Sequence, residues 1–361
     1  MKVIFDHLCF WQRYGGVPRY FVELYKHLPK QTVEMTVRFS DNEYLRSAGL
    51  KVRPFAGRWE FRGRSRLEKQ WGKIFSIARL MRRDYDVYHQ THYDCYAYHF
   101  LSPSVGRVTT LHDANFFTHE ALYNPSSSLR REMIRSAELA DHIITVSNYS
   151  KQKICHYLGC AEQKVSVIYH GIDHALCRQA EPLATHERYI LYVGARNAYK
   201  NFSGLCDAFA LARLREPSLR LYCCGAQSSN AEREMLRKKG IERNVRFLSP
   251  TDSELFSLYK SARCFVFPSF AEGFGLPIIE AMAAGCPTLL AERSCFPEIA
   301  DTAAQYFNPE DVEEMCDKIL ECSEEGSLRE RLIAAGRARA AQFTWRRSAE
   351  EHMKIYNTLR R

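Results

Sequence analysis

The architecture of this 361-residue chain is indicated by Cys264-Phe-Val-Phe-Pro-Ser-Phe-Ala-Glu-Gly-Phe-Gly-Leu-Pro-Ile-Ile-Glu-Ala-Met-Ala-Ala-Gly-Cys-Pro-Thr-Leu-Leu-Ala291. The apolar run Cys264–Pro268 predicts a strand, and a loop with two glycines follows it. Pro277 suits the first turn of a helix, where its missing N–H is not needed. A second apolar run, Pro287–Ala291, predicts the next strand. Strands that alternate with helices indicate a parallel, doubly wound sheet.

The same alternation continues on both sides of this stretch. We interpret His174–Glu187, which has no clear hydrophobic period, as a linker between two halves. Before it, the predicted strands are Val3–Phe5, Val33–Phe39, Val87–His89, Val108–Leu111, Ile143–Val146 and Val165–Tyr169. After it, they are Tyr189–Val193, Leu219–Cys224, Val245–Leu248, Cys264–Pro268 and Pro287–Ala291. The fold class is therefore α/β, with two Rossmann-like units whose strand ends are expected to face a central cleft.

Composition excludes several classes of protein. With 46% hydrophobic and 26% charged residues, the chain is globular rather than disordered or collagen-like. No apolar run approaches 18 residues, so no transmembrane helix is predicted. The chain starts without the apolar segment of a signal peptide, and its 13 cysteines form no Cys-x-x-Cys pair. Both features favour a cytoplasmic location without a disulfide framework.

The loop and helix after Pro268 have the features of an anion site. Gly273 and Gly275 let a ligand approach the backbone closely, and the free N–H groups of the helix start suit a diphosphate. Glu272 lies in the loop, and Glu280 lies about one turn into the helix. Sugar and ribose hydroxyls would satisfy these carboxylates as acceptors. The alternative is a pair of solvated glutamates on an ordinary helix.

Two cations follow the predicted strand Tyr189–Val193. Arg196 and Lys200 lie in a loop before a helix, where Arg clamps phosphate with two hydrogen bonds and Lys adds a point charge. The alternative is two surface cations near a helix start. In the first half, Gly15 and Gly16 precede a helix and can bring backbone N–H groups to the same diphosphate. The full G-x-G-x-x-G pattern is missing, which argues against a dinucleotide dehydrogenase.

Histidines and aspartates in the first half offer further candidates. His112 follows a predicted strand, at the end expected to face the cleft. His89 and His92 follow another strand, and contact with an acceptor is their functional interpretation; the alternative is a polar loop. Asp84-Tyr-Asp86 fits a metal-binding D-x-D pattern but precedes a strand, so we interpret it as turn chemistry. No metal site is expected.

These motifs together resemble family 4 of the glycosyltransferases, which are retaining enzymes of the GT-B fold. The stretch Glu272–Glu280 resembles the family's E-x7-E signature, and the similarity extends along nearly the whole chain. The other matching segments are Tyr14-Gly-Gly-Val-Pro-Arg-Tyr20, Leu111-His-Asp113, Ala140-Asp-His-Ile-Ile-Thr-Val-Ser147 and Tyr192-Val-Gly-Ala-Arg-Asn-Ala-Tyr-Lys-Asn201. Within the family, the glycine loop is most similar to that of bacterial mannosyltransferases that build O-antigen and capsule chains.

The resemblance assigns roles to these residues. His112 and Glu272 are the expected catalytic residues, with Glu272 contacting the sugar, Glu280 holding the ribose, and Arg196 and Lys200 neutralising the leaving diphosphate. The full set expected to bind the donor is Gly15, Gly16, Arg196, Lys200, Glu272, Gly273, Phe274, Gly275, Leu276 and Glu280. The residues expected to contact the acceptor are Tyr14, Arg19, His89 and His92.

The function expected from this resemblance is transfer of a hexose, most simply mannose from GDP-mannose, to a growing lipid-linked surface glycan. Residues 1–172, with a crossover helix at 344–361, would form the acceptor-side domain, and residues 187–343 the nucleotide-sugar domain. The nucleotide sugar is a co-substrate, and no cofactor is expected. The alternatives are a UDP-sugar transferase, a nucleotide-sugar epimerase, and a non-enzymatic scaffold that binds anionic surfaces through residues 51–83.

The segment Lys51–Arg83 holds eleven Lys and Arg against two acidic residues, so it carries all of the chain's net charge of +9. Aromatic residues are interleaved with these cations, as in surfaces that meet anionic lipid headgroups. We therefore expect a peripheral position on the inner face of the cytoplasmic membrane, and no nucleic-acid partner. The expected membrane patch is Arg58, Trp59, Arg62, Arg64, Arg66, Lys69, Trp71 and Lys73.

Overall fold

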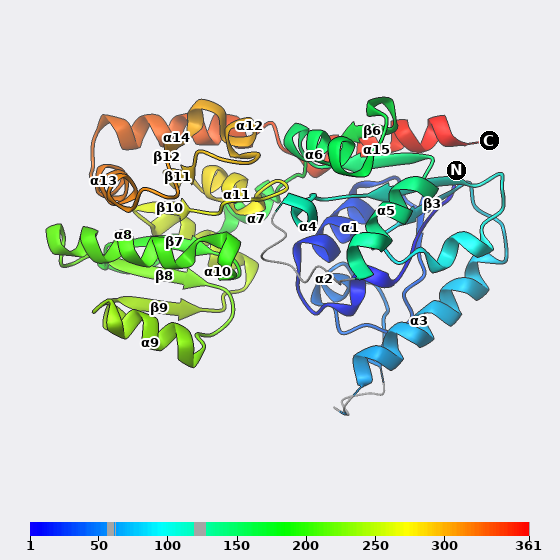
Figure 1. Ribbon diagram of the computed structural model, residues 1–361, viewed down its shortest axis with the longest axis horizontal. Coiled ribbons are helices and arrows are strands. Elements are labelled where there is room, and N and C mark those ends of the chain that lie inside the picture. The colour runs from blue at the N-terminus through cyan, green and yellow to red at the C-terminus, as the bar shows by residue number, and fades with distance from the viewer. Residues whose placement is uncertain (56–60, 62, 119–127, 361) are drawn as a thin grey trace. The chain divides into compact units, whose positions relative to one another are not determined.

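A computed structural model describes residues 1–55, 61, 63–118 and 128–360, and its elements can be followed in Figure 1. The chain divides into two compact units. Unit 1 comprises Met1–Gly171 together with Trp345–Arg361, and unit 2 comprises Ile172–Thr344. The last helix thus belongs to the unit that contains the N-terminus.

Unit 1 contains a six-stranded parallel sheet in the order β2-β1-β3-β4-β5-β6. Its strands are β1 Val3–Phe5, β2 Val33–Met35, β3 Val87–Gln90, β4 Gly106–Thr110, β5 His142–Thr145 and β6 Val165–Val167. The predicted strand Val33–Phe39 is too long, because β2 is an edge strand that pairs only with the three residues of β1. Phe39 instead forms an isolated bridge with Arg53.

The helices of unit 1 include a long one in the basic segment, α3, which covers Arg64–Leu80. The others are α1 Gly16–His27, α2 Glu43–Ser47, α4 Asn115–Thr118, α5 Ser128–Leu139, α6 Asn148–Leu158 and α15 Trp345–Leu359. The short 3₁₀-helices in the described part of unit 1 are η1 Leu8–Trp11, η2 Cys95–Phe100 and η4 Glu162–Lys164. The C-terminal helix α15 packs against α1 and β4, which attaches the end of the chain to unit 1.

Unit 2 contains a second six-stranded parallel sheet, in the order β12-β11-β10-β7-β8-β9. Its strands are β7 Tyr189–Val193, β8 Arg220–Cys224, β9 Val245–Leu248, β10 Cys264–Phe267, β11 Thr288–Ala291 and β12 Gln305–Phe307. Strand β12 was not predicted, because a three-residue edge strand is too short to show an apolar period. The two sheets confirm the predicted α/β architecture.

The helices of unit 2 begin in the segment that we predicted to be a linker. Within His174–Glu187, residues His174–Gln179 form helix α7, which Asp173 caps by accepting a hydrogen bond from the Leu176 N–H at 2.9 Å. Six residues are too few to show a helical period. The other helices are α8 Phe202–Arg215, α9 Asn230–Lys238, α10 Asp252–Ser261, α11 Leu276–Ala284, α12 Phe296–Ala300, α13 Val312–Ser323 and α14 Ser327–Ala340, with 3₁₀-helices η5 Ala198–Lys200, η6 Glu242–Asn244 and η7 Asp301–Ala303.

A buried polar cluster joins α15 to the rest of unit 1. The Tyr20 hydroxyl lies 2.6 Å from His352 Nε2, and the Tyr356 hydroxyl lies 2.7 Å from His89 Nδ1. The second nitrogen of each ring is also bonded: His89 Nε2 to the Thr110 hydroxyl at 2.8 Å and His352 Nδ1 to a backbone carbonyl. Fully paired polar groups can be buried without the cost of an unmade hydrogen bond.

We predict that acid weakens the protein through this cluster. Burial lowers the pKa of His352 to about 4 and lowers that of His89 well below its usual range. Below pH 6.5 the unfolded chain binds protons that the native state excludes, so each such histidine costs about 1.4 kcal/mol of unfolding free energy per pH unit. Burial raises the pKa of Asp6 to about 6 and that of Glu68 to about 7, which opposes this trend, whereas burial lowers the pKa of further histidines in unit 1 and adds to it. Denaturant unfolding is therefore expected to show a loss of at least about 2 kcal/mol between pH 7 and pH 5.

Two variants serve to check the source of this pH dependence. His352→Gln removes one buried titrating ring and should flatten the slope of unfolding free energy against pH. His156 is exposed, so His156→Gln should leave that slope unchanged. Equal unfolding free energies at pH 7 and pH 5 in the unmodified protein would contradict the prediction.

Candidate active site

In unit 2, the loop between β10 and α11 has the conformation that its glycines permit. Gly275 is the N-cap residue of α11 and has a φ of 88°, a left-handed conformation that favours glycine. A Cβ at this position would lie 2.7 Å from the Cδ1 atom of Ile278, which is fully buried. Pro277 occupies the first turn, as predicted. The start of α11 therefore presents the positive end of its dipole at the carboxyl edge of the sheet.

The loops after β7 and β10 are joined side by side. The Phe270 N–H donates to the Tyr199 carbonyl at 2.8 Å, which brings the following residues of the two loops together. Lys200 and Glu272 form an ion pair there, and each side chain is 13% exposed. This arrangement places a cation and a carboxylate beside the start of α11.

A residue from a third loop holds Glu272 in place. Ser294, after β11, accepts a hydrogen bond from the Glu272 N–H at 2.9 Å and donates one to the Glu272 carbonyl at 2.6 Å. Ser294 has a φ of 60°, an uncommon conformation for a non-glycine residue. Ser294 was not predicted as a site residue, because an isolated serine in a loop carries no periodic or motif signal.

Glu280 lies within α11 and is buried, with an exposed fraction of only 3%. The Tyr259 hydroxyl, from the neighbouring helix α10, donates to Glu280 Oε2 at 3.4 Å. A carboxylate is rarely buried to this extent unless it is paired or hydrogen-bonded. The second glutamate of the motif is therefore built into the helix interface, whereas the first is held in the loop.

Arg196 and Lys200 have different partners in the structure. Arg196 Nε donates to Glu232 Oε1 of α9 at 2.5 Å, and its Nη2 donates to the Gln227 carbonyl at 3.0 Å. The guanidinium also lies over the Phe247 ring, 4.8 Å from its centroid, and the side chain is only 5% exposed. Arg196 thus connects β7 to the loop after β8, and a different carboxylate neutralises each of the two cations.

In unit 1, His112 follows β4, as the sequence predicted. Its ring stacks on that of His170, with the ring centroids 5.8 Å apart, and meets the Tyr20 ring edge-on. Burial lowers the pKa of His112 to about 4, so the ring is neutral at pH 7. Within the part of the chain that the structure describes, the buried Nε2 atom has no hydrogen-bond partner. Such an orphaned atom can be satisfied by a ligand hydroxyl.

The glycine loop of unit 1 lies at the start of α1. Gly15 is the N-cap residue, and its carbonyl accepts from the Arg19 N–H at 3.2 Å. A Cβ on Gly16 would meet nothing within 4 Å, so internal packing does not require glycine there. Tyr14 is exposed and lies edge-on to Tyr44. The first turn of α1 is therefore open to an incoming group.

The structure corrects the expected role of His89. The ring is fully buried in the cluster with Tyr356 and Thr110, and both of its nitrogens are hydrogen-bonded. His89 is a core residue for this reason and does not face a ligand. His92, by contrast, is partly exposed beside Tyr93.

The aspartates of the D-x-D pattern form ion pairs rather than a ligand cluster. Asp84 pairs with Lys2 and Arg79, and Asp86 accepts from the Lys2 N–H at 2.7 Å. Over the described ranges, no group of three or more His, Cys, Asp or Glu side chains is arranged to hold a metal ion.

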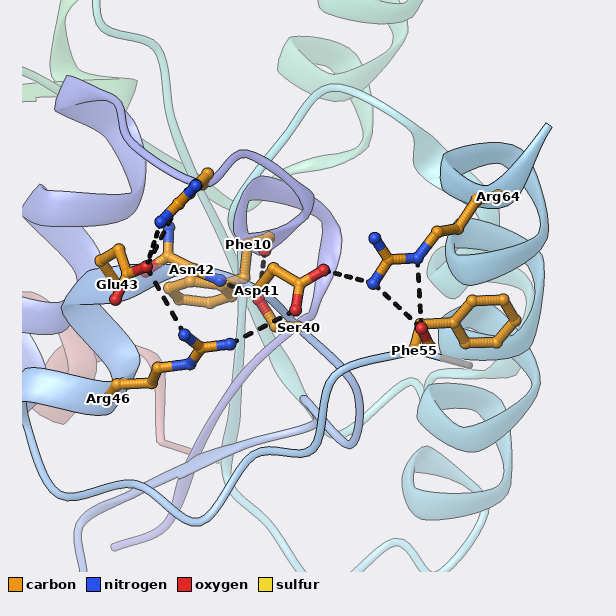
Figure 2. Close-up of polar contacts among 9 residues, drawn as sticks. Phe10, Ser40, Asp41, Asn42, Glu43, Arg46, Phe55 and Arg64 are labelled. Atoms are coloured by element: carbon orange, nitrogen blue, oxygen red, sulfur yellow. Dashed lines mark hydrogen bonds and ion pairs between the residues drawn. The ribbon is translucent and has the colours of Figure 1, made fainter. Parts of the chain in front are cut away.

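The members of the expected membrane patch differ in their surroundings. Arg66 and Trp71 are exposed. Arg64 pairs with Asp41 and donates to the Phe55 carbonyl (Figure 2). Lys69 lies over the Trp11 ring, and Lys73 pairs with Asp94. The remaining members, Arg58, Trp59 and Arg62, lie outside the described residues. None of the helices in the described ranges is both long and apolar enough to cross a bilayer.

Comparison with known proteins identifies the class that this fold and site define. The model of Glycosyltransferase Family 4 matches residues 14–176, and that of Glycosyl transferases group 1 matches residues 175–339. Among solved structures, Anabaena Alr3699/HepE in complex with UDP superposes with a TM-score of 0.74 over 99% of this chain and 100% of that one, at 18% identity. Sucrose-phosphate synthase from Thermosynechococcus elongatus gives 0.74 over 99% of each chain, at 19% identity. The fold is that of GT-B glycosyltransferases.

Curated relatives have the same character. O-antigen chain mannosyltransferase B of Escherichia coli is 29% identical over 308 residues, which cover 79% of this chain and 80% of the relative. D-inositol 3-phosphate glycosyltransferase of Corynebacterium glutamicum is 26% identical in an alignment of 386 residues that covers 95% of this chain and 91% of the relative. The chain is a glycosyltransferase and belongs to family 4, whose members are retaining and generally metal-independent.

We predict that the two cations of unit 2 have separable effects on nucleotide binding. Lys200→Ala should weaken binding of a nucleoside diphosphate at least tenfold more than binding of the monophosphate, because it removes a cation beside the start of α11. Arg196→Ala should weaken both nucleotides by the same factor, because Arg196 holds the loop after β8. Calorimetric titrations of the protein with GDP and GMP, and with UDP and UMP, give the ratio of diphosphate to monophosphate affinity for each base.

The matched control for this prediction is Arg215→Ala, which breaks an exposed ion pair with Asp317 elsewhere in unit 2 and should change neither ratio. If Arg196→Ala abolished the preference for the diphosphate, Arg196 would be a direct diphosphate ligand and the prediction would be wrong.

Proposed function

We propose that this glycosyltransferase transfers mannose from GDP-mannose to a growing lipid-linked surface glycan, with retention at the anomeric carbon. The observation that carries the proposal is the Lys200–Glu272 pair beside the glycine-capped start of α11, with the buried Glu280 in the same helix. The choice of mannose is supported by the curated relatives, several of which are named O-antigen or serotype-specific mannosyltransferases.

In this proposal, the donor exchanges partners with the ion pair. A diphosphate that binds at the start of α11 meets the helix N–H groups and the Lys200 ammonium. Glu272 is then released from Lys200 and can accept hydrogen bonds from the hydroxyls of the transferred sugar. Glu280 can accept from the ribose. Positive charge already in place where the leaving group develops negative charge lowers the barrier to transfer.

We assign His112 to the sugar side of the reaction. Because its pKa lies near 4, the ring is neutral at pH 7 and is no electrostatic partner for phosphate. Its Nε2 atom has no hydrogen-bond partner among the described residues, so it can form a hydrogen bond with a sugar hydroxyl. The acceptor proton passes to the leaving diphosphate on the same face of the sugar, which is consistent with retention.

A transfer assay tests the proposed function. The protein is incubated with a lipid-linked glycan extract and either GDP-mannose or UDP-glucose, and the products are separated by chromatography. Glu272→Ala and Lys200→Ala should each reduce mannose transfer at least a hundredfold, about 2.7 kcal/mol of transition-state stabilisation. Arg215→Ala should leave the rate unchanged.

Each other outcome of the assay has a defined meaning. Near-normal rates in both site variants would overturn the site assignment. Transfer from UDP-glucose alone would keep the transferase and exclude mannose. Conversion of the sugar nucleotide without an acceptor would indicate an epimerase instead.

We also propose that helix α3 docks unit 1 on the inner leaflet, where a lipid-linked acceptor resides. Four large apolar side chains, each exposed, follow one face of the helix and its end: Leu67, Trp71, Ile74 and Met81. Their spacing of about one and two turns places them on a common stripe. The exposed Arg66 adds a positive charge beside it. A basic helix with an exposed apolar stripe suits the interface of an anionic membrane.

Vesicle flotation measures this docking. The triple variant Leu67→Ser, Trp71→Ser and Ile74→Ser should lose at least tenfold of its binding to vesicles that contain phosphatidylglycerol, because it removes the apolar area that enters the interface. Leu214→Ser is the control, since Leu214 is the most exposed apolar side chain of unit 2. Equal flotation of the triple variant and the unmodified protein would exclude α3 as the docking element.

A further inference from the structure

The carboxyl edge of the unit 1 sheet contains a reversal of strand order that the proposed reaction leaves unused. From β1 the chain moves to β2 on one side, and it later returns to β3 on the other side of β1. In open parallel sheets, ligands bind beyond the carboxyl ends of the strands at such a switch point. The residues that follow β1 and β3 here include His7, Trp11 and His92.

The segment after β1 is held rigidly. Asp6 accepts from the Leu8 N–H at 3.0 Å, and its second oxygen accepts from the Tyr88 hydroxyl at 2.5 Å. Further along, Ser40 donates to the Phe10 carbonyl at 2.5 Å (Figure 2). Asn42 donates to the Gln12 carbonyl at 2.6 Å. Trp11 is thus bracketed by two backbone anchors.

Trp11 nevertheless remains 39% exposed. Because the backbone around Trp11 is already anchored, a ligand that covers this ring loses little free energy in ordering it. The Lys69 ammonium lies 3.8 Å from the centroid of this ring. Helix α3 reaches this position because Gly72 lets it pack on His7, whose Cδ2 would be 2.3 Å from a Cβ at that position.

Lys69 differs from Arg64 and Lys73 in having no ion pair with a carboxylate of the described residues. Lys73 pairs with Asp94 at 2.5 Å and Arg64 pairs with Asp41 at 2.5 Å, whereas no carboxylate of the described residues lies within 4 Å of the Lys69 ammonium. Desolvation by burial lowers the pKa of Lys69, and the carboxylates of Asp94 and Glu68 offset this effect only in part. Burial also keeps the adjacent His7 neutral, with a pKa of about 4.

We propose that Trp11 and Lys69 form an acceptor subsite that binds a sugar carrying an anionic group, with the sugar ring against the indole and the phosphate or carboxylate on the Lys69 ammonium. His92 follows β3 at the same edge of the sheet, and burial, with a smaller contribution from the Lys69 charge, lowers its pKa. The inference rests on the proposed function, because it names the class of acceptor for that reaction. The apolar C–H face of a sugar covers indole area that is otherwise exposed to water, and the anion forms a direct ion pair with the Lys69 ammonium.

Ligand-observed NMR tests the subsite without any turnover. The probes are glucose 1-phosphate and glucuronic acid, with methyl glucoside as the neutral control. The unmodified protein should bind both anionic sugars at least tenfold more tightly than methyl glucoside. Lys69→Met should abolish that preference and Lys69→Arg should retain it. Trp11→Ala should weaken all three probes, and Lys200→Ala, at the donor site of unit 2, should change none.

The outcomes separate the possible sources of the anion. Tighter binding of glucose 1-phosphate than of glucuronic acid points to the phosphate of a lipid-linked sugar, and the reverse points to an acidic sugar residue. Binding that survives in Lys69→Met but is lost in Lys200→Ala would overturn the proposal, as would failure of the unmodified protein to bind either anionic probe. Thermal unfolding confirms that each variant is folded.

The transfer assay distinguishes failure of the subsite from failure of the proposed function. Trp11→Ala and Lys69→Met should raise the acceptor KM at least tenfold while the donor KM stays unchanged. An unchanged acceptor KM alongside normal mannose transfer would overturn the subsite alone. Specific binding of the anionic probes by a protein that transfers no sugar would refute the proposed function and leave the subsite standing.

Discussion

The ion pair between Lys200 and Glu272 is the contact on which the site of unit 2 depends. The two residues are 72 positions apart and meet because β7 and β10 are neighbours in the sheet. The backbone bond from Phe270 to Tyr199 joins their loops, and Ser294 adds the loop after β11. Three adjacent strands thus converge on one short stretch of backbone at the start of α11. The parallel arrangement makes this possible, since all carboxyl ends lie along the same edge.

Charge pairing explains how a lysine and a glutamate can both be largely buried at this site. Burying either charge alone would cost free energy, and the ion pair compensates for that cost. A bound diphosphate can replace Glu272 as the partner of Lys200. Arg196 illustrates the other outcome. Its contacts with Glu232, Gln227 and Phe247 use its donors and its flat face inside unit 2. One cation is therefore available for exchange, whereas the other maintains the shape of the neighbouring loop.

In unit 1, the packing of helices determines which polar groups can meet a ligand. Helix α15 buries His89 and His352 against α1 and β4, and the ring nitrogens of both residues form hydrogen bonds within unit 1. Helix α3 has two different faces. Its inner face carries Lys69 toward Trp11 through the close approach at Gly72, and its outer face leaves an apolar stripe exposed. One helix thus connects the switch point of the sheet to the surface that we propose for the membrane.

The alternation of strands and helices, the strand–loop–helix motif with Glu272 and Glu280, and the family could all be predicted from the amino-acid sequence. These features are local: an apolar run, a glycine at a left-handed position and a proline in a first turn are visible within a few residues. The short elements β12 and α7 escaped detection because three or six residues show no period. The packing of the folded chain was needed to show that Lys200 pairs with Glu272 while Arg196 pairs with Glu232, and that His89 is buried. It also shows that Lys69 lies over Trp11 with no carboxylate of the described residues within 4 Å. Such partnerships depend on the order of strands in a sheet and on the closeness of helix packing, which join residues far apart in the chain.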